Sequence, residues 1–473
     1  MDAKKSLHGS IRDRMFHEMA DKSLFDQAKE YAYDYADYTP GRNPFPSVEA
    51  IDLLREFDEL LPESSRDPHE ILEKLHKFGS PGTVLHTGGR YFGFVIGGTL
   101  PVALAARWLG DFWDQNGGLF ATSPVISKLE TVTEKWLRQL FRLPDDVVSG
   151  FVSGTTTAVF CSLAAARYRI LERQGWDINE KGLFNAPRIR VVAGLHAHGA
   201  VLKSISMLGL GRGNIEWVDV DDQGRMIPEK VPLPDRNTIL ILQAGNVNSG
   251  SFDPFNEICE KAARAGAWIH IDGAFGLWAA CSEKLSHLTK GIEMASSWSV
   301  DGHKTLNIPY DCGIVMCRDS DALVSALHVT GSYLIHGANR DGYLYTSEMS
   351  RRSRITELWA AIRYLGSKGI AELVDGLHER AVQFAGELRE SGFQVLNEVV
   401  FNQVLVACDN DTLTARTLEL IQNSGESWCG GAQWFDRKVI RISVCSWATT
   451  RDDITRSVRA FTRAYSDARK QNL

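Results

Sequence analysis

From about residue 150 to residue 317, short runs rich in β-branched and other apolar residues alternate with stretches of helical spacing. The strand-like runs are 188–193, 215–220, 238–243, 267–272, 297–301 and 313–317. Helix-like segments, such as 158–173, 199–208 and 255–265, precede or separate several of them. Because parallel neighbours need a crossover connection, this alternation predicts an α/β domain built on a mostly parallel sheet.

The regions on either side of this alternation have a different pattern. The first 85 residues are typical of helices, and Asp67 followed by Pro68 and Glu70 is a helix-start signature. After Arg351, two long helical stretches lead into strands at 393–396, 403–407 and 439–444 and a final helix. We therefore predict a helical, dimer-forming N-terminal segment (1–85), a large domain (86–350) and a small α+β C-terminal domain (351–473).

Composition argues against several classes of partner. The 473 residues include 52 Lys and Arg against 59 Asp and Glu, a formal charge of −7, with no basic run to bind nucleic acid. The longest apolar stretch, 92–106, is interrupted by glycines and a proline and is too short to span a bilayer. The eight cysteines lack the spacing of a metal site. We expect a cytoplasmic protein without a metal, membrane or nucleic-acid partner.

Two segments contain residues suited to binding a flat, phosphorylated ligand. In the run 153–157, Gly154, Thr155 and Thr156 stand at the start of a helix, where free backbone amides can bind phosphate. An ordinary helix cap is the more common role of such a run. His198 lies at a strand-to-helix junction, where its ring could stack on a heteroaromatic ring. A hydrogen-bonded structural histidine is the alternative, and His196 lies two residues away.

Two further segments carry an acid and a lysine. Asp272 ends a strand-like run, and the carboxyl ends of parallel strands face the crevice where ligands bind. A protonated pyridine nitrogen would be a cationic partner for this carboxylate, whereas a cap of the next element is the alternative. Lys304 stands among apolar residues, with Asp301 as the one nearby acid. A desolvated lysine can form a Schiff base with an aldehyde.

The order of these four segments resembles that of the group II pyridoxal 5′-phosphate (PLP)-dependent decarboxylases, which include the aromatic L-amino acid, glutamate and histidine decarboxylases. The resemblance covers most of the chain, through RYFGFVIGG, DFWDQN, SKLETVTEKWL, SGTTTA, HGAVLKS, HIDGAFG, DGHK and MSRRSRITELWAAIRYLGSKG. It implies the aspartate aminotransferase fold (fold type I). In that fold, a large domain with a mostly parallel, seven-stranded sheet between helices accompanies a helical N-terminal segment and a small α+β C-terminal domain.

The resemblance implies a role for each matching residue. Lys304 would hold PLP as a Schiff base, Asp272 would pair with the pyridine nitrogen, and His198 would stack on the ring. The remaining cofactor contacts would come from Ala274 on the other ring face and, at the phosphate, from Gly154, Thr155, Thr156 and His303. Tyr333, on a loop beyond the lysine, would protonate the substrate carbon, with Tyr343 and Tyr345 as alternatives.

Three stretches depart from the family's pattern. Gly302 precedes His303 where alanine is common, and Gly273 stands in place of the first alanine of Asp-Ala-Ala. The stretch AGNVNSGSFD replaces a Gly-Thr-Thr run next to the cofactor, so Asn246 and Asn248 are candidates for a different ligand contact.

The reaction implied is α-decarboxylation of an L-amino acid to its amine, through an external aldimine and a quinonoid. An aldehyde synthase or a retro-aldol carbon–carbon lyase on the same scaffold stays open, as does a non-catalytic regulatory relative. The candidate substrate-pocket residues are aromatic (Tyr91, Phe92, Phe94, Phe112 and Trp113), or would suit an acidic side chain (Arg90, His86 and His336). The resemblance also implies a homodimer with its active site at the subunit interface.

Overall fold

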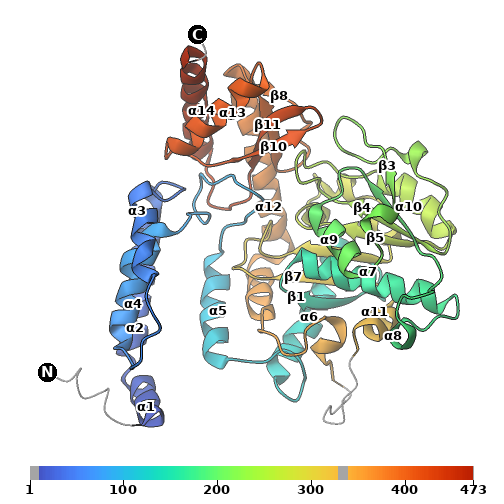
Figure 1. Cartoon of the computed structure of the whole chain (residues 1–473), viewed down its shortest axis with the longest axis horizontal. Helices are drawn as coiled ribbons and strands as arrows, with labels where there is room; N and C mark the ends of the chain where they lie inside the picture. Colours follow the sequence, from blue (N-terminus) through green and yellow to red (C-terminus); the bar gives the residue numbers. More distant parts are fainter. Residues whose placement is uncertain (1–9, 329–338, 472–473) are drawn as a thin grey trace.

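The computed structural model describes residues 10–328 and 339–471. Its N-terminal helices form a column beside the rest of the molecule (Figure 1). They are α1 (Ile11–Asp21), α2 (Ser23–Tyr38), α3 (Val48–Asp52) and α4 (Pro68–Lys74). Asp67 caps α4 as predicted, with its carboxylate accepting a hydrogen bond from the amide of His69. Within these four helices no side chain is fully buried.

The large body of the molecule is organised around a seven-stranded sheet. Its strands are β1 (Val148–Val152), β2 (Arg190–Gly194), β3 (Ile215–Val218), β4 (Thr238–Gln243), β5 (Trp268–Asp272), β6 (Ser297–Asp301) and β7 (Gly313–Cys317). They lie in the order β1-β7-β6-β5-β4-β2-β3, and only the two pairings of β7 are antiparallel. The predicted mostly parallel sheet is confirmed, and β1 is a strand that the sequence reading missed.

Helices cover both faces of this sheet. In β4, Ile239 and Ile241 belong to the hydrophobic core on one face, while Leu240 and Leu242 belong to the core on the other. The first face is covered by α7 (Thr155–Glu172), α9 (Gly199–Met207) and α11 (Ser320–Leu327). The second is covered by α6 (Pro124–Phe141), α10 (Phe255–Arg264) and the 3₁₀ segment η8 (Gly276–Cys281). Further helices are α5 (Pro101–Trp113) and the short α8 (Ile178–Lys181).

The register of the central strands brings their carboxyl ends together. Gln243 of β4 lies opposite Asp272 of β5, and Asp272 lies opposite Ser299 of β6. Asp301 then ends β6 two residues further on. Because these strands are parallel, the residues that follow them meet at one edge of the sheet, and α7 begins near the same edge.

The long helix α12 (Ile355–Glu390) leads from the large sheet to the C-terminal region (Figure 1). There, four antiparallel strands lie in the order β10-β11-β9-β8. Their bounds are β8 (Gln394–Val395), β9 (Gln403–Ala407), β10 (Gly430–Trp434) and β11 (Arg437–Ser443), and the helices beside them are α13 (Asp411–Asn423) and α14 (Arg451–Gln471). Strand β10 was not predicted. Across the described parts of the chain, no helix is both long and apolar enough to cross a membrane.

Candidate active site

Lys304 follows β6 and forms an ion pair with the acid that ends this strand. Its Nζ lies 3.0 Å from Oδ2 of Asp301. The other carboxylate oxygen, Oδ1, accepts a hydrogen bond of 2.7 Å from the backbone amide of Thr155, the first residue of α7. The fold therefore connects the predicted Schiff-base lysine to the predicted phosphate loop through Asp301, which the sequence reading had noted but given no role.

His303 lies between the same carboxylate and the phosphate loop. Its Nε2 is 3.6 Å from Oδ2 of Asp301, and its Nδ1 accepts a hydrogen bond of 3.0 Å from the amide of Cys312. A Cβ added to Gly154 would lie 3.4 Å from the ring of His303, so the two are neighbours. Burial lowers the pKa of His303, and the negative charge of Asp301 opposes this effect.

Asp272 ends β5 and is 4% exposed. Its Oδ1 accepts a hydrogen bond of 3.3 Å from the amide of Ala274. Burial raises the pKa of Asp272, while the positive charges of His198 and Lys304 act in the opposite direction. A buried carboxylate with a raised pKa is stabilised by a further cation, which is what a protonated pyridine nitrogen would supply.

His198 caps α9 and also faces the site. Its Nδ1 accepts a hydrogen bond of 3.1 Å from the amide of Ala200, so the neutral ring carries its proton on Nε2. Loss of hydration lowers the pKa of His198, and Asp272 opposes this shift. The residue as a whole is exposed. His198 thus has the structural role considered for it, as the cap of α9. This role does not conflict with stacking on a cofactor ring.

Asn246 lies in the loop after β4 and is 1% exposed. Its Oδ1 accepts hydrogen bonds from the amides of Asn248 (2.9 Å) and Ser249 (3.3 Å), which sets the orientation of its side chain. Its Nδ2 has no hydrogen-bond partner within the described residues. A Cβ added to Gly224 would lie 3.0 Å from this nitrogen and 3.0 Å from Nδ1 of His196. The amide of Asn246 therefore faces Gly224 and His196.

Arg441, on β11, is a candidate site residue that the sequence reading missed. Its Nη1 donates a hydrogen bond of 3.3 Å to the carbonyl of Val247, next to Asn246, while its Nε has no partner in the part of the chain that the structure describes. Its positive charge contributes to the lowered pKa of His198. Nothing in the local sequence around Arg441 indicates a ligand site, because its position depends on the packing of the C-terminal sheet against the large one.

The tyrosines considered as proton donors have different positions. Tyr333, like His336, lies outside the described residues. Tyr343 is 2% exposed in a short 3₁₀ turn, where its amide donates to the carbonyl of Gly118. The ring of Tyr345 lies 4.3 Å from the guanidinium of Arg340. Tyr343 and Tyr345 are thus held by packing.

The candidate pocket residues do not form one group. Phe92 is fully buried and packs against Phe384 in the core of the C-terminal region, so its assignment to a substrate pocket is wrong. Arg90 lies 3.2 Å from Glu426 and 3.8 Å from Asp453, so its charge is already paired within the chain. Of the other aromatic members, Tyr91 is buried and stacks on Trp428. The remaining three, Phe94, Phe112 and Trp113, are exposed.

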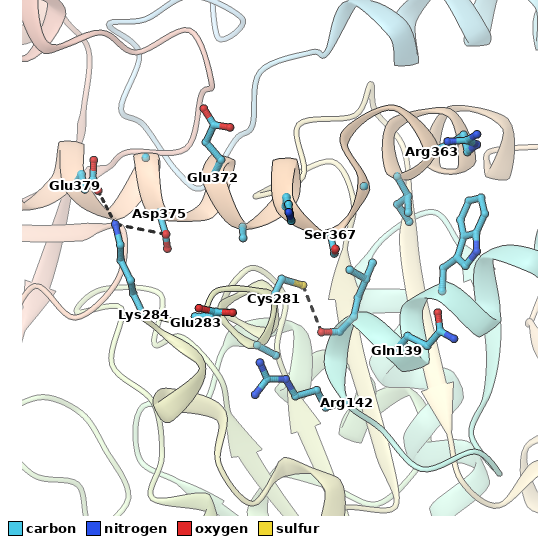
Figure 2. Close-up of a pocket in the computed structure, with 18 of the residues that line it drawn as sticks. Gln139, Arg142, Cys281, Glu283, Lys284, Arg363, Ser367, Glu372, Asp375 and Glu379 are labelled. Carbon is cyan, nitrogen blue, oxygen red and sulfur yellow. Dashed lines mark hydrogen bonds and ion pairs between the residues drawn. The ribbon is translucent and has the colours of Figure 1, made fainter.

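A separate cleft of about 1180 Å³ lies between α6, the end of η8 and α12 (Figure 2). Its walls carry charges of both signs, and Lys284 reaches across to Asp375 (3.6 Å) and Glu379 (3.0 Å) on α12. None of the predicted site residues lines this cleft. We therefore assign the functional site to the edge of the sheet.

The residues at that edge fit PLP. The side chain of Thr155 is buried, and its Oγ1 has no partner within the described residues. Together with the N-terminus of an 18-residue helix, it offers donors to a phosphate. Asp272 and Lys304 suit the pyridine nitrogen and the aldehyde. Such a site on a mostly parallel, seven-stranded sheet defines the class of protein: a PLP-dependent enzyme of fold type I.

Comparison with known families identifies the chain more closely. The model of the pyridoxal-dependent decarboxylase conserved domain matches residues 51–407, which is most of the chain. The chain belongs to this family. It is therefore a PLP-dependent carboxy-lyase by family, and PLP is its cofactor.

Similar proteins include decarboxylases with different named substrates. The acidic amino acid decarboxylase GADL1 of Mus musculus is 28% identical over 73% of this chain, and the match spans 65% of the mouse protein. The aromatic-L-amino-acid decarboxylase of Bacillus atrophaeus is 25% identical over 78% of each chain. The structure of Oryza sativa TDC with PLP and tryptamine superposes with a TM-score of 0.87 at 20% identity, over 95% of this chain and 98% of that one. This last likeness supports the fold.

Proposed function

We propose that the protein decarboxylates an L-amino acid to its amine, with PLP bound by Lys304. The observation that carries this proposal is the meeting of Lys304, Thr155 and His303 at one buried carboxylate, Asp301, beside Asp272. When bound, PLP supplies a sink for the electrons of the broken bond between Cα and the carboxylate.

The residues of this chain have separate tasks in the proposal. Asp272 would pair as a carboxylate with the pyridine nitrogen of PLP, and His198 and Ala274 would hold its ring between them. The phosphate is held by residues of the α7 turn and a neighbouring histidine, namely Gly154, Thr155, Thr156 and His303. Tyr333 would supply the proton for Cα, and exclusion of water from the site would protect the reaction.

Arg441 is our candidate for the contact with a substrate carboxylate. It is a partly buried guanidinium whose Nε is buried and has no partner within the described residues, and burial lowers its pKa. A carboxylate would pair with it by charge-assisted hydrogen bonds. Asn246, whose Nδ2 also has no such partner, lies one residue from the carbonyl that Arg441 binds and completes the proposed cofactor and substrate contacts.

We also propose that the protein is a cytoplasmic homodimer with its active site at the subunit interface. Large apolar side chains are exposed along α1 and α5, namely Ile11, Met15, Phe16, Met19, Leu104, Trp108, Leu109, Phe112 and Trp113. An apolar surface of this extent is typical of a protein interface. Pairing of two copies through the N-terminal column would cover it.

Product analysis tests the reaction. The purified protein with PLP is incubated with each proteinogenic L-amino acid, L-DOPA and cysteate, and carbon dioxide, amine, ammonia and carbonyl products are measured together. Carbon dioxide and amine without ammonia are expected. A carbonyl product with ammonia would instead establish an aldehyde synthase, and a carbonyl fragment without carbon dioxide a retro-aldol lyase.

The Lys304→Ala variant tests the cofactor assignment. We expect it to lose the visible absorbance of the lysine-bound cofactor and more than about 100-fold in decarboxylation rate, because the covalent anchor and exchange partner is gone. Lys290→Ala, which changes an exposed lysine of the same region, is the matched control and should keep both. An unchanged spectrum in Lys304→Ala would exclude Lys304 as the PLP lysine.

A further inference from the structure

Asp301 is held rigidly at the centre of the site. It is 2% exposed, and its backbone is anchored on both sides, since its amide donates to the carbonyl of Ala274 (2.9 Å) and its carbonyl accepts from the indole of Trp278 (2.9 Å). Its carboxylate contacts the amide of Thr155 and the charged end of Lys304. Neither the main chain nor the side chain of Asp301 can move far without breaking these bonds.

The charge of this carboxylate is compensated mainly by Lys304. Within the described residues, the basic groups within 4.0 Å of Asp301 are Lys304 at 3.0 Å and His303 at 3.6 Å. The pKa of His303 is lowered, so its ring is largely neutral at neutral pH and contributes little positive charge. A buried carboxylate is costly without a cation, and so is a lysine of which only 19% is exposed.

Lys304 alternates between two conditions during the proposed reaction: bonded to the cofactor or free. When a substrate amine takes its place, the substrate nitrogen enters as an ammonium with three protons and keeps one, while Lys304 leaves with three. The exchange is balanced and consumes no proton. The nitrogen of Lys304 carries a positive charge before and after it, but only the released ammonium has three N–H donors that need acceptors inside the site.

We propose that Asp301 is a positioning residue that receives the Lys304 ammonium whenever Lys304 is not bonded to PLP. The proposal rests on the assignment of Lys304 as the PLP lysine. The observation behind it is the position of Nζ, which lies 3.0 Å from Oδ2 of Asp301. By stabilising the released lysine, Asp301 favours replacement of Lys304 by the substrate amine and keeps the lysine within reach for its return.

Asp301→Asn separates this electrostatic role from a structural one. The asparagine has the same size and keeps an oxygen that can accept the hydrogen bond from the amide of Thr155, but it has no charge to hold the lysine. Asp253→Asn is the matched control. Asp253 is also buried and accepts bonds of 2.7 Å from the amides of Met226 and Gln243, and among the described residues it forms no ion pair with a lysine or arginine.

The first measurement uses the cofactor-free protein, so it does not depend on the reaction. A neutral acylating reagent, acetic anhydride, modifies an amine and not an ammonium, and peptide mass spectrometry gives the rate at Lys304 relative to exposed lysines of the same sample. We expect acylation about tenfold or more faster in Asp301→Asn than in the wild type. Asp253→Asn should not change it. Equal rates in wild type and Asp301→Asn would overturn the proposal.

The second measurement is the dissociation constant of PLP and of pyridoxal, which lacks the phosphate. Because the free lysine loses its counter-ion, both should bind about tenfold more tightly to Asp301→Asn. A purely structural Asp301 predicts weaker binding, and tighter binding of PLP alone would mean that Asp301 acts on the phosphate; both results overturn the proposal. If Asp301→Asn does not fold, Asp301→Ser, which also keeps an acceptor oxygen, carries the same two measurements.

The loss of the lysine-bound cofactor spectrum in Lys304→Ala and the acylation result are independent. If Lys304→Ala keeps a normal cofactor spectrum, the assignment of Lys304 in the proposed function fails, and the positioning role of Asp301 fails with it. If Lys304 proves to be the PLP lysine and its acylation rate is the same in the wild type and in Asp301→Asn, the positioning role alone fails.

Discussion

Single residues at this site show how a buried charge is held where solvent cannot stabilise it. Asp272 and Asp301 each end a buried strand, and each accepts a hydrogen bond from a backbone amide. These bonds aim the carboxylates, and the cations near them offset part of the cost of burial. Strand β5, which ends at Asp272, carries a third buried ionisable group, His270, which the proposed reaction does not use.

His270 predicts how stability depends on pH. Burial lowers its pKa to about 3, and its Nδ1 lies 3.0 Å from the hydroxyl of Ser297. In the unfolded chain the pKa of a histidine is about 6.5. The unfolded chain therefore takes up a proton first as the pH falls. The stability that neutral His270 provides is complete above about pH 6.5 and is lost progressively toward pH 3.

In urea unfolding at pH 7, 6 and 5, we expect the free energy of unfolding of the wild type to fall more steeply than that of His270→Gln. The difference between the two slopes should approach about 1.4 kcal/mol per pH unit below pH 6. Parallel curves for the two proteins would show that His270 is not the group responsible.

At the scale of elements, α12 joins the two sheets and changes direction at one glycine. Gly366 has φ 60° and ψ −177°, a conformation that residues with a side chain rarely adopt. Beyond this kink, α12 passes over the cleft of Figure 2, where Lys284 pairs with Asp375 and Glu379. Lys284 is well exposed, so these ion pairs contribute little, and the backbone of Gly366 is the stronger determinant of the helix direction.

Substitution of Gly366 by alanine tests this determinant. We expect Gly366→Ala to lower the free energy of unfolding by about 1–3 kcal/mol, because alanine is strained at a positive φ of this kind. Gly386→Ala is the matched control. Gly386 lies in the regular part of the same helix with open space around it, and the change should be neutral or stabilising by up to about 1 kcal/mol. Chemical denaturation of both variants measures the difference, and equal effects would contradict the interpretation.

For the whole molecule, the main feature that the single chain leaves unexplained is the apolar surface exposed on its N-terminal helices and on α5. The N-terminal helices bury no side chain completely, and α5 beside them exposes Leu109 and Phe112 at 56% and 60%. Contacts within the chain, such as Phe25 against Phe112, cover part of this surface. The remainder supports the proposed homodimer. The proposed division at residues 85 and 350 stays a prediction, which limited proteolysis can test.

A charge placed on this surface should dissociate the dimer. We expect Leu109→Glu to elute as a monomer in size-exclusion chromatography with light scattering at concentrations where the wild type is a dimer, because a buried unpaired carboxylate costs several kcal/mol. Phe184→Glu is the control and should remain a dimer. Phe184 is 89% exposed and lies between α8 and β2, outside the N-terminal helices and α5. A monomeric wild type that binds PLP would refute the dimer proposal.

The sequence by itself determined that the sheet is mostly parallel and which residues are candidates for the chemistry. Strand periodicity depends on neighbouring residues, so β2 to β7 were recognised, and Lys304, Asp272 and His198 stand in local patterns that resemble one family. Which groups face each other depended on tertiary structure. The pairing of Lys304 with Asp301, the paired charge of Arg90 and the approach of Arg441 arise from segments far apart in the chain. A local pattern specifies which residues an element carries, whereas electrostatic partners are set by how elements pack in space.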